Sequence, residues 1–448
     1  MVLGLGWAPF WFGGDRPLAW GVNAIVFGAL VVALELYKLA TGSSHPVALR
    51  RIWLSALGLA VVVAWTLIQM SPWVPASFQH PIWRLAEEQL GQPVPGSISV
   101  NRDATALALV RLLTNASAFW LAIQVCRSRQ RSVWLVQAVA MIGLAYAIYG
   151  LIAFLMFPGS ILWFTKVAYP ESLTSTFVNR NSYATYAAIG LVCAFALVLR
   201  SFSAVEQQST AWRQAAAVLV AFNGAGGFWL ATTLVVGAAF MLTGSRAGIL
   251  CGLAGVVTIA ILAVVRRKQS ANHGEVAIAI AVLALGAIGL SYGETFASRI
   301  SDFGLRLDDR LLVDKMVLIA IADHPVLGFG FGTFEHVFPM YRDASISPFG
   351  RWDKVHNDYL EAVIGFGVPI AAVFMCGLAL LVGRCFWGVV SRRHYNTAGA
   401  AATAVSVVVL AHAAVDFSLQ MPGVSLTFAA VLGAGVAQSW SRRTDTAT

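Results

Sequence analysis

The sequence has little charge and few cysteines, and both shortages narrow the class of protein. Only 11% of its 448 residues are charged and 58% are hydrophobic, whereas a soluble domain has about 25% charged residues. The five cysteines show no CxxC spacing and no neighbouring histidine, which disfavours a disulfide framework or a cysteine metal site. They are interpreted as small buried apolar residues. The composition therefore predicts an integral membrane protein.

Several sequence signals of cofactor and partner binding are also missing. The chain has no HExxH motif, no Walker motif and no dinucleotide-binding glycine pattern followed by a Rossmann unit. We therefore predict no metal and no cofactor. The net charge of +9 could indicate nucleic acid, but short basic loops that stay on the cytoplasmic side explain it better. The first residues, MVLGLGWAPFWFGG, lack the basic start of a signal peptide and are too short to span, so we expect an interfacial anchor.

Long apolar segments fill most of the chain and predict an all-α polytopic fold. A membrane-spanning helix needs about 20 residues, so the length allows eleven or twelve transmembrane helices and one large outer loop. A twelfth span would involve the first residues or the Ala215–Gly226 region. The eleven candidate spans are Leu18–Leu39, Ile52–Met70, Thr105–Cys126, Val133–Phe157, Ser182–Leu199, Gly226–Leu242, Gly248–Val265, Val276–Leu290, Leu360–Val382, Thr397–Val415 and Val424–Ala437.

Clusters of Lys and Arg recur at alternate ends of these spans and mark the cytoplasmic side. Because the basic clusters alternate in this way, the connections without them are expected on the outer face. The tail at residues 438–448 is expected in the cytoplasm. The outer connections are Ser71–Ala104, Pro158–Asn181, Gly244–Ala247, Tyr292–Tyr359 and Asp416–Gly423.

The connection Tyr292–Tyr359 is the one long segment with the composition of a water-facing protein. It carries seven of the thirty Lys and Arg residues and three of the eight histidines. The apolar spacing of Asp309–Ile321 predicts a helix that ends at His324-Pro325, and GFGFG after it predicts a tight turn. Irregular backbone and charge at a membrane are tolerated only where water or protein satisfies them. We therefore expect this loop to pack as short helices and to carry the chemistry.

Two arginines are candidate anion ligands on the outer side. Arg246 lies in TGSRAG at the end of a span, and Arg310 begins the predicted loop helix. Guanidinium groups match the oxygens of phosphate and diphosphate, so the pair suits an anionic, lipid-linked ligand. The alternative is that such arginines pair with loop carboxylates or extend to the water interface.

His356, in VHNDYLEAVIGFG, is the candidate general base. An imidazole can accept a proton near neutral pH, and His356 lies where the loop re-enters the membrane. A structural hydrogen-bonding role is the alternative.

Polar residues at two further helix ends are candidate substrate contacts. Asn179 and Asn181 lie in FVNRNSYATY at the start of a span, where asparagine also caps helices. Asp416, in HAAVDFSLQMPG, is unfavourable for the dipole of the helix that it ends. We therefore expect a specific partner for it, such as an arginine; a water-facing turn is the alternative.

The order of these motifs around one large outer loop resembles the O-antigen ligase and Wzy-type polysaccharide polymerase superfamily. The resemblance covers about Thr176 to Gly423 and rests on FVNRNSYATY, TGSRAG, Arg310 before HPVLGFGFGTF, HNDYLEAVIGFGVPI and HAAVDFSLQMP. It suggests N-terminal transmembrane helices at residues 1–175, a catalytic membrane region at 176–437 that includes the loop at 292–359, and the tail at 438–448.

The resemblance implies a glycosyltransferase of the bacterial inner membrane that acts on the periplasmic face. The donor would be a glycan on undecaprenyl diphosphate, and transfer would be inverting and metal-independent. Arg246 and Arg310 would hold the diphosphate, and His356 would deprotonate or orient the acceptor hydroxyl. Asn179, Asn181 and Asp416 would contact substrate. The acceptor would be lipid A core for a ligase, which we favour, or a lipid-linked repeat unit for a polymerase.

A transporter is the competing class. Sparse intramembrane charges, mainly Glu35 and Arg111, could line a permeation path. However, no paired half-repeat is visible, and the one-sided charged loop fits an enzyme better.

Overall fold

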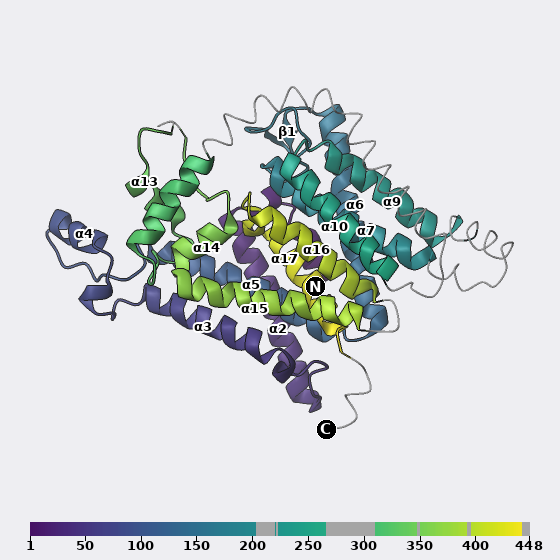
Figure 1. Cartoon of the computed structure of the whole chain (residues 1–448), viewed down its shortest axis with the longest axis horizontal. Coiled ribbons are helices and arrows are strands. Elements are labelled where there is room, and N and C mark those ends of the chain that lie inside the picture. Colours follow the sequence, from purple (N-terminus) through teal and green to yellow (C-terminus); the bar gives the residue numbers. More distant parts are fainter. Residues whose placement is uncertain (203–219, 221–222, 266–309, 347–349, 392–395, 441–448) are drawn as a thin grey trace.

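The structure is a computed structural model that describes residues 1–202, 220, 223–265, 310–346, 350–391 and 396–440 (Figure 1). Within these ranges the chain is almost entirely helical, and its only strands are β1 (Ser160–Ile161) and β2 (Phe164–Thr165), which form one antiparallel hairpin. The predicted all-α class is confirmed.

Ten long helices form the body of the molecule. Seven segments are long and apolar enough to cross a membrane, and α9, α16 and α17 are shorter apolar helices. The fold is thus that of a polytopic membrane protein. Nine of the eleven predicted spans coincide with these helices, the predicted span Leu360–Val382 overlaps two helices, and the predicted span Val276–Leu290 lies outside the described residues. The long helices are α2 (Pro17–Thr41), α3 (Trp53–Met70), α5 (Arg102–Val125), α6 (Arg129–Met156), α7 (Arg180–Phe202), α9 (Ala225–Met241), α10 (Arg246–Val265), α15 (Val368–Val390), α16 (Thr397–Ala413) and α17 (Pro422–Ala437).

Short helices connect these segments, most of them near one end of the bundle. The α-helices among them are α1 (Val2–Trp7), α4 (Ile82–Leu90), a helix over residues 310–323, α13 (Phe334–Tyr341) and α14 (Asp358–Phe366), and the 3₁₀ turns are η1 (Phe12–Gly14), η2 (Leu49–Ile52), η3 (Ala76–Phe78) and η5 (Ser418–Gln420). The helix at 310–323 agrees with the predicted loop helix Asp309–Ile321.

The predicted span Leu360–Val382 is wrong at both ends, because it merges two helices. Helix α14 ends at Phe366, and α15 starts at Val368 after Gly367. Gly367 has a φ of +81°, and a Cβ there would lie 2.1 Å from the carbonyl oxygen of Val326, so the break requires glycine. Pro369 then fits the first turn of α15, where its missing N–H has no helical acceptor. Hydropathy runs smoothly through this break and does not reveal it.

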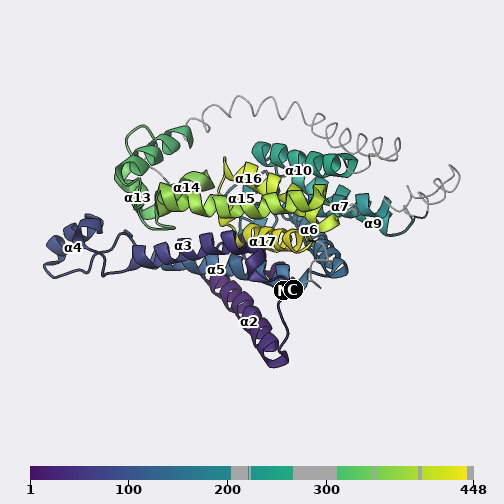
Figure 2. The ribbon, with the colours of Figure 1, turned by 60° about the horizontal axis from the view of Figure 1, so that its bottom comes forward.

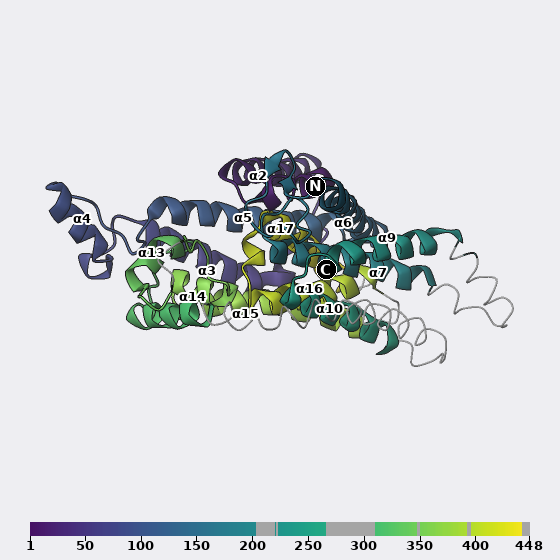
Figure 3. The same ribbon diagram turned by 90° about the horizontal axis from the view of Figure 1, so that it is seen from above.

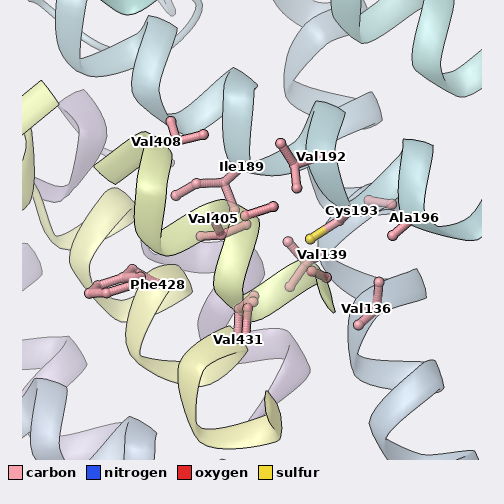
Figure 4. Packing of buried hydrophobic residues seen from close by; sticks show 14 of the residues in the cluster. Val136, Val139, Ile189, Val192, Cys193, Ala196, Val405, Val408, Phe428 and Val431 are labelled. Atoms are coloured by element: carbon pink, nitrogen blue, oxygen red, sulfur yellow. The ribbon is translucent and has the colours of Figure 1, made fainter. Parts of the chain in front are cut away.

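Helix α7 is the centre of the bundle. An 18-residue window of α7 is wholly buried, whereas the corresponding windows of α2, α3 and α15 are at most 17% buried. Figure 4 shows Ile189 and Val192 of α7 close to Val139 of α6 and Val405 of α16, which belong to the same buried cluster. Small residues allow close approach of the helices: a Cβ on Gly143 of α6 would lie 3.1 Å from the backbone of α7. The outer helices therefore face lipid, and α7 holds its first turn in a fixed place.

The described part of the large loop has a hydrophobic core of its own. Val313, Val317, Phe334 and Phe338 are buried together with Val100, which comes from the predicted outer loop Ser71–Ala104. Figures 2 and 3 both show α4, α13 and α14 gathered at one end of the α3–α15 pair. The two loops thus lie at the same end of the bundle, and the expectation that the large loop packs as short helices is confirmed for its described residues.

The GFGFG turn anchors this loop to α14. The Phe329 N–H donates to the Ile364 carbonyl at 2.9 Å, and the Phe329 carbonyl accepts from the Val100 N–H at 3.0 Å. Gly330 has a φ of +103°, and a Cβ there would lie 2.4 Å from Ser99 Oγ, so no other residue fits without strain. The buried Gln69 side chain of α3 donates to the Gly365 carbonyl at 2.8 Å. These contacts fix α14, and with it His356, relative to the bundle.

Candidate active site

The first turn of α7 brings two predicted site residues to the end of the bundle. Asn179 accepts a hydrogen bond from the Asn181 N–H at 2.7 Å and thereby caps the helix. The Asn181 side chain donates from Nδ2 to Asp416 Oδ2 at 2.8 Å and accepts from Ser245 Oγ at 2.8 Å. One amide thus joins the start of α7, the residue before α10 and the turn after α16.

Asp416 is fully buried and belongs to a network of neutral groups. Its Oδ1 accepts from Ser418 Oγ at 3.1 Å. The buried His412 Nδ1 lies 3.1 Å from Ser418 Oγ and 2.7 Å from Thr185 Oγ1. Because Ser418 donates its only O–H to Asp416, His412 Nδ1 carries the proton toward Ser418. Hydrogen bonds offset the cost of burying this carboxylate, and Asn181 and Ser418 are two of its partners. The sequence led us to expect a specific partner for Asp416, and an arginine partner stays a prediction.

Arg310 reaches the same corner from the large loop. Its Nη1 donates to the Val415 carbonyl at 3.2 Å, one residue before Asp416. Helix α10 begins at Arg246, the residue after Ser245, so the backbone of this second predicted arginine lies beside the Asn181 amide. The structure therefore brings together the regions of Arg246, Arg310, Asn181 and Asp416, which are far apart in the sequence.

His356 borders this network immediately before α14. Its ring makes edge-to-face contacts with Phe417 at a centroid distance of 4.9 Å and with Trp352 at 5.5 Å. Burial, reinforced by the positive charge of Arg310 and opposed by Asp416, lowers the pKa of His356 from 6.5 to about 4. Nδ1 is buried without a hydrogen-bond partner among the described residues. The imidazole is thus neutral near pH 7.

Asn357 explains why His356 is held at this point. Its side-chain oxygen accepts from the N–H groups of Tyr359 and Leu360 at 3.1 and 3.2 Å and caps α14. The Tyr359 hydroxyl donates to the Leu410 carbonyl of α16 at 2.8 Å. The HNDY segment therefore orients the histidine through a helix cap and a tie to the neighbouring helix.

A second polar group lies on the other side of the η5 turn. Gln420 Nε2 donates to Asp358 Oδ1 at 2.9 Å and to Glu361 Oε2 at 2.8 Å. Arg111 of α5 donates to the Gln420 carbonyl and stacks over the Trp20 ring at 4.6 Å. We did not predict this group from the sequence, although Asp358 and Glu361 are three residues apart and hence share one helix face.

The N-terminal residues also contribute to this end of the molecule. Lys354 lies 3.8 Å from Asp15, which directly follows η1. Thr176 Oγ1 donates to the Pro9 carbonyl at 2.7 Å, and a Cβ on Gly13 would lie 2.4 Å from the Phe177 ring. The segment that the sequence predicts to be an interfacial anchor therefore packs against Thr176 and Phe177, which lie just before α7.

No group of three or more His, Cys, Asp or Glu residues within the described ranges has the arrangement of a metal site. We therefore assign no metal ligand among them. The other intramembrane charge noted in the sequence, Glu35, accepts from Trp120 Nε1 and pairs with His45, both at 2.8 Å. Those contacts explain Glu35 as a structural residue.

Together these features define a class: an all-α, multi-pass membrane protein with a buried polar site where α7, α10 and α16 meet a folded loop. Residues 230–375 match a family model described as O-antigen ligase, Wzy_C. This match supports the resemblance to the O-antigen ligase superfamily that the sequence motifs predicted. It includes Arg246, Arg310 and His356, and it leaves out Asn179, Asn181 and Asp416. The search of curated proteins gave no match.

The family match supports the general function expected from the motifs. Members of the superfamily are ligases or polymerases of the glycosyltransferase type, which work on lipid-linked glycans at a bilayer. A protein of this kind needs a multi-pass membrane body, and the seven long apolar helices among the described residues fit that requirement.

Proposed function

We propose that this protein transfers a glycan from undecaprenyl diphosphate to an acceptor hydroxyl at the periplasmic face of the bacterial inner membrane. The observation that carries the proposal is the neutral His356 beside Arg310 and the buried Asp416, inside the region that matches the family. Transfer proceeds by direct displacement, with inversion at the anomeric carbon and without metal or nucleotide. The favoured acceptor is lipid A core; a lipid-linked repeat unit is the alternative.

Arg246 and Arg310 bind the donor diphosphate in this mechanism. As the bond from the anomeric carbon to the phosphate oxygen breaks, the diphosphate gains negative charge. Fixed cations stabilise that charge most strongly when they are held in place before the reaction. Arg310 is held by its contact with the Val415 carbonyl, and Arg246 by its position at the first turn of α10.

His356 accepts the proton of the attacking hydroxyl. The oxygen of that hydroxyl forms the new bond to the anomeric carbon, and its proton moves to the imidazole. The resulting positive charge is favoured by Asp416, which already raises the pKa of His356 against the opposing effects. A positioning role is the alternative for His356, in which the ring orients the hydroxyl without taking its proton.

For the remaining predicted residues we propose positioning roles. The Asn181 side chain forms hydrogen bonds with both Asp416 and Ser245. These bonds fix the positions of α7, α10 and the turn after α16 relative to one another. Asn179 caps α7. Each acts on the substrate through the geometry of the arginines and the histidine.

A transfer assay tests the proposal. Purified protein in nanodiscs would receive undecaprenyl-diphosphate oligosaccharide with and without lipid A core, in the absence of metal and nucleotide. We expect transfer to lipid A core that His356→Ala and Arg246→Ala abolish. The matched controls are His336→Ala, an exposed loop histidine, and Arg84→Ala, an exposed arginine of α4; both should remain active.

The other outcomes of this assay are equally informative. Chain growth on the lipid-linked glycan without lipid A core would identify a polymerase. Activity that persists in both site variants would refute the assigned residues. Absence of transfer under every condition would contradict the enzymatic function and favour a transporter.

A further inference from the structure

A cavity of about 760 Å³ opens beside the Gln420 group. Its walls are apolar and come from α2, α3, α5, α15 and α17, which are helices of the membrane body. This volume is in the range of binding sites for small organic ligands. A cavity of this kind at membrane depth suits hydrocarbon chains.

The wall of this cavity contains polar groups that no protein atom satisfies. Asn23 of α2 is 2% exposed, and neither its side-chain oxygen nor its nitrogen has a hydrogen-bond partner among the described residues. The Trp20 Nε1, one turn earlier, is also buried without a partner there. An unpaired amide in such surroundings is costly, and polar residues inside a membrane protein are usually functional. The pair therefore points to a ligand with hydrogen-bonding atoms.

The position of Asn23 limits the chemistry of that ligand. Asn23 is six residues after the start of α2 at Pro17, so it lies about 9 Å along the helix from that end. A ligand that meets it must carry a polar atom below its headgroup. A polyisoprenyl chain has none beyond its diphosphate. Acyl chains joined through amides or esters, or bearing hydroxyl groups, have donors or acceptors at that level.

The charged end of the cavity also favours a hydroxyl-bearing headgroup over a diphosphate. Asp358, Glu361 and Gln420 all line the cavity. Burial raises the pKa of Asp358 well above its usual value and the pKa of Glu361 to about 7. These carboxyl groups can exchange hydrogen bonds with sugar hydroxyls, and they offer no positive charge to a phosphate. Arg111 also lines the cavity, and the nearby carboxyl groups of Asp15, Asp358 and Glu361 favour and offset its positive charge.

We propose that this cavity holds the acyl chains of the acceptor, an acylated glycolipid, and that Asn23 selects it over polyprenyl-linked molecules. The assignment to the acceptor rests on the proposed function. It places the acceptor hydroxyls near Glu361 and Asp358, within the same short helix that His356 precedes. The donor then occupies the opposite side of the η5 turn, where the arginines lie.

Lipid binding, measured by native mass spectrometry without any donor turnover, tests this proposal. The probes are rough lipopolysaccharide, whose lipid A core carries amide-linked hydroxyacyl chains, and undecaprenyl diphosphate. We expect Asn23→Leu to weaken lipopolysaccharide binding about tenfold and to leave undecaprenyl diphosphate binding unchanged. Asn23→Gln should restore part of the loss, and Ile25→Ala, on the lipid-exposed face of α2, should bind both probes as the wild type does.

Thermal stability provides a second readout. Because the Asn23 amide is unpaired, Asn23→Leu should keep or raise the Tm while binding falls. Unchanged lipopolysaccharide binding, or a Tm that falls, would overturn the proposal. The Asn23 amide would then bind a water molecule or stabilise the fold. Weaker binding of undecaprenyl diphosphate would assign the cavity to the donor chain and overturn it as well. Selective binding without transfer would instead contradict the proposed function and leave an acyl-lipid site.

Discussion

The two polar groups on either side of the η5 turn differ in how their atoms are satisfied. On one side, Asn181, Asp416 and Ser418 bond to one another and leave the neutral His356 beside Arg310. On the other side, Gln420 bridges two carboxylates that line an apolar cavity, whose wall includes the unpaired Asn23. The first group is satisfied internally, whereas the second lies beside an amide without a partner among the described residues. Under the proposed function, the first side would bind the donor and the second the acceptor.

The largest effect is expected on the charged side. His356→Ala should lower the transfer rate about 10²–10⁴-fold, as expected for removal of a general base, without changing the fold. Single-turnover kinetics with saturating donor and acceptor would measure it. The exposed His336→Ala is the control, and a loss below tenfold would favour the positioning role for His356.

The hydrogen bond between Asn181 and Asp416 is expected to matter for both stability and rate. Removal of either partner leaves the other buried and unsatisfied, at a cost of about 1–3 kcal/mol. A double-mutant cycle with Asn181→Ala and Asp416→Ala, measured by chemical denaturation, should show a coupling of about 0.5–3 kcal/mol. Additive effects of the two substitutions would mean that the contact is incidental.

On the other side, Gln420 is expected to hold two carboxylates that would otherwise repel each other. Gln420→Leu removes both hydrogen bonds, so it should destabilise the protein by about 1–3 kcal/mol. Gln420→Leu combined with Glu361→Gln should recover part of that loss, because one of the two charges is then gone. Tm measurements in detergent would test this, and equal stability of both variants would show that the carboxylates do not interact.

The smallest effect is the displacement of the pH profile. Because the pKa of His356 is lowered to about 4, the ring stays neutral down to about pH 5, whereas a histidine with a pKa of 6.5 would be mostly protonated there. Activity should therefore be unchanged between pH 7 and 5.5 and fall below about pH 4.5. The same lowered pKa destabilises the folded state below pH 6.5, because His356 is protonated there in the unfolded state and stays neutral in the folded state. Loss of activity at pH 6.5, with the protein still folded, would contradict the burial of this base.

The sequence was sufficient for nine of the eleven predicted spans, and it indicated Arg246, Arg310 and His356 as candidate residues of the charged side. Apolar length defines spans, and motifs such as SRAG and HNDY mark where helices begin, so the regions of Arg246 and His356 could be expected at one face. The contact of Asn181 with Asp416 joins residues 235 positions apart, and one sequence contains no signal for such a pairing. Hence the sequence suggests a specific partner for Asp416, such as an arginine, but it does not indicate the Asn181 amide to which Asp416 bonds.

The side with Asp358, Glu361 and Gln420 is harder to predict from the sequence, because no local motif links its residues to one another. Arg111 is isolated in an apolar span, and Gln420 lies in a short turn; only the fold brings them together. The break at Gly367 was missed because hydropathy is continuous across it, although the following Pro369 was a visible signal. Asn23 is a single polar residue in a span, and its lack of a partner is apparent only in three dimensions.

Two-substrate kinetics would test most directly that the donor and acceptor occupy opposite sides of the η5 turn. Initial transfer rates would be measured while each substrate is varied, for the wild type, Arg310→Lys and Glu361→Gln. We predict that Arg310→Lys raises the KM for the lipid-linked donor about tenfold and leaves the acceptor KM unchanged, and that Glu361→Gln does the reverse. If both substitutions raise the KM for the same substrate, the division of the site into a donor side and an acceptor side is wrong.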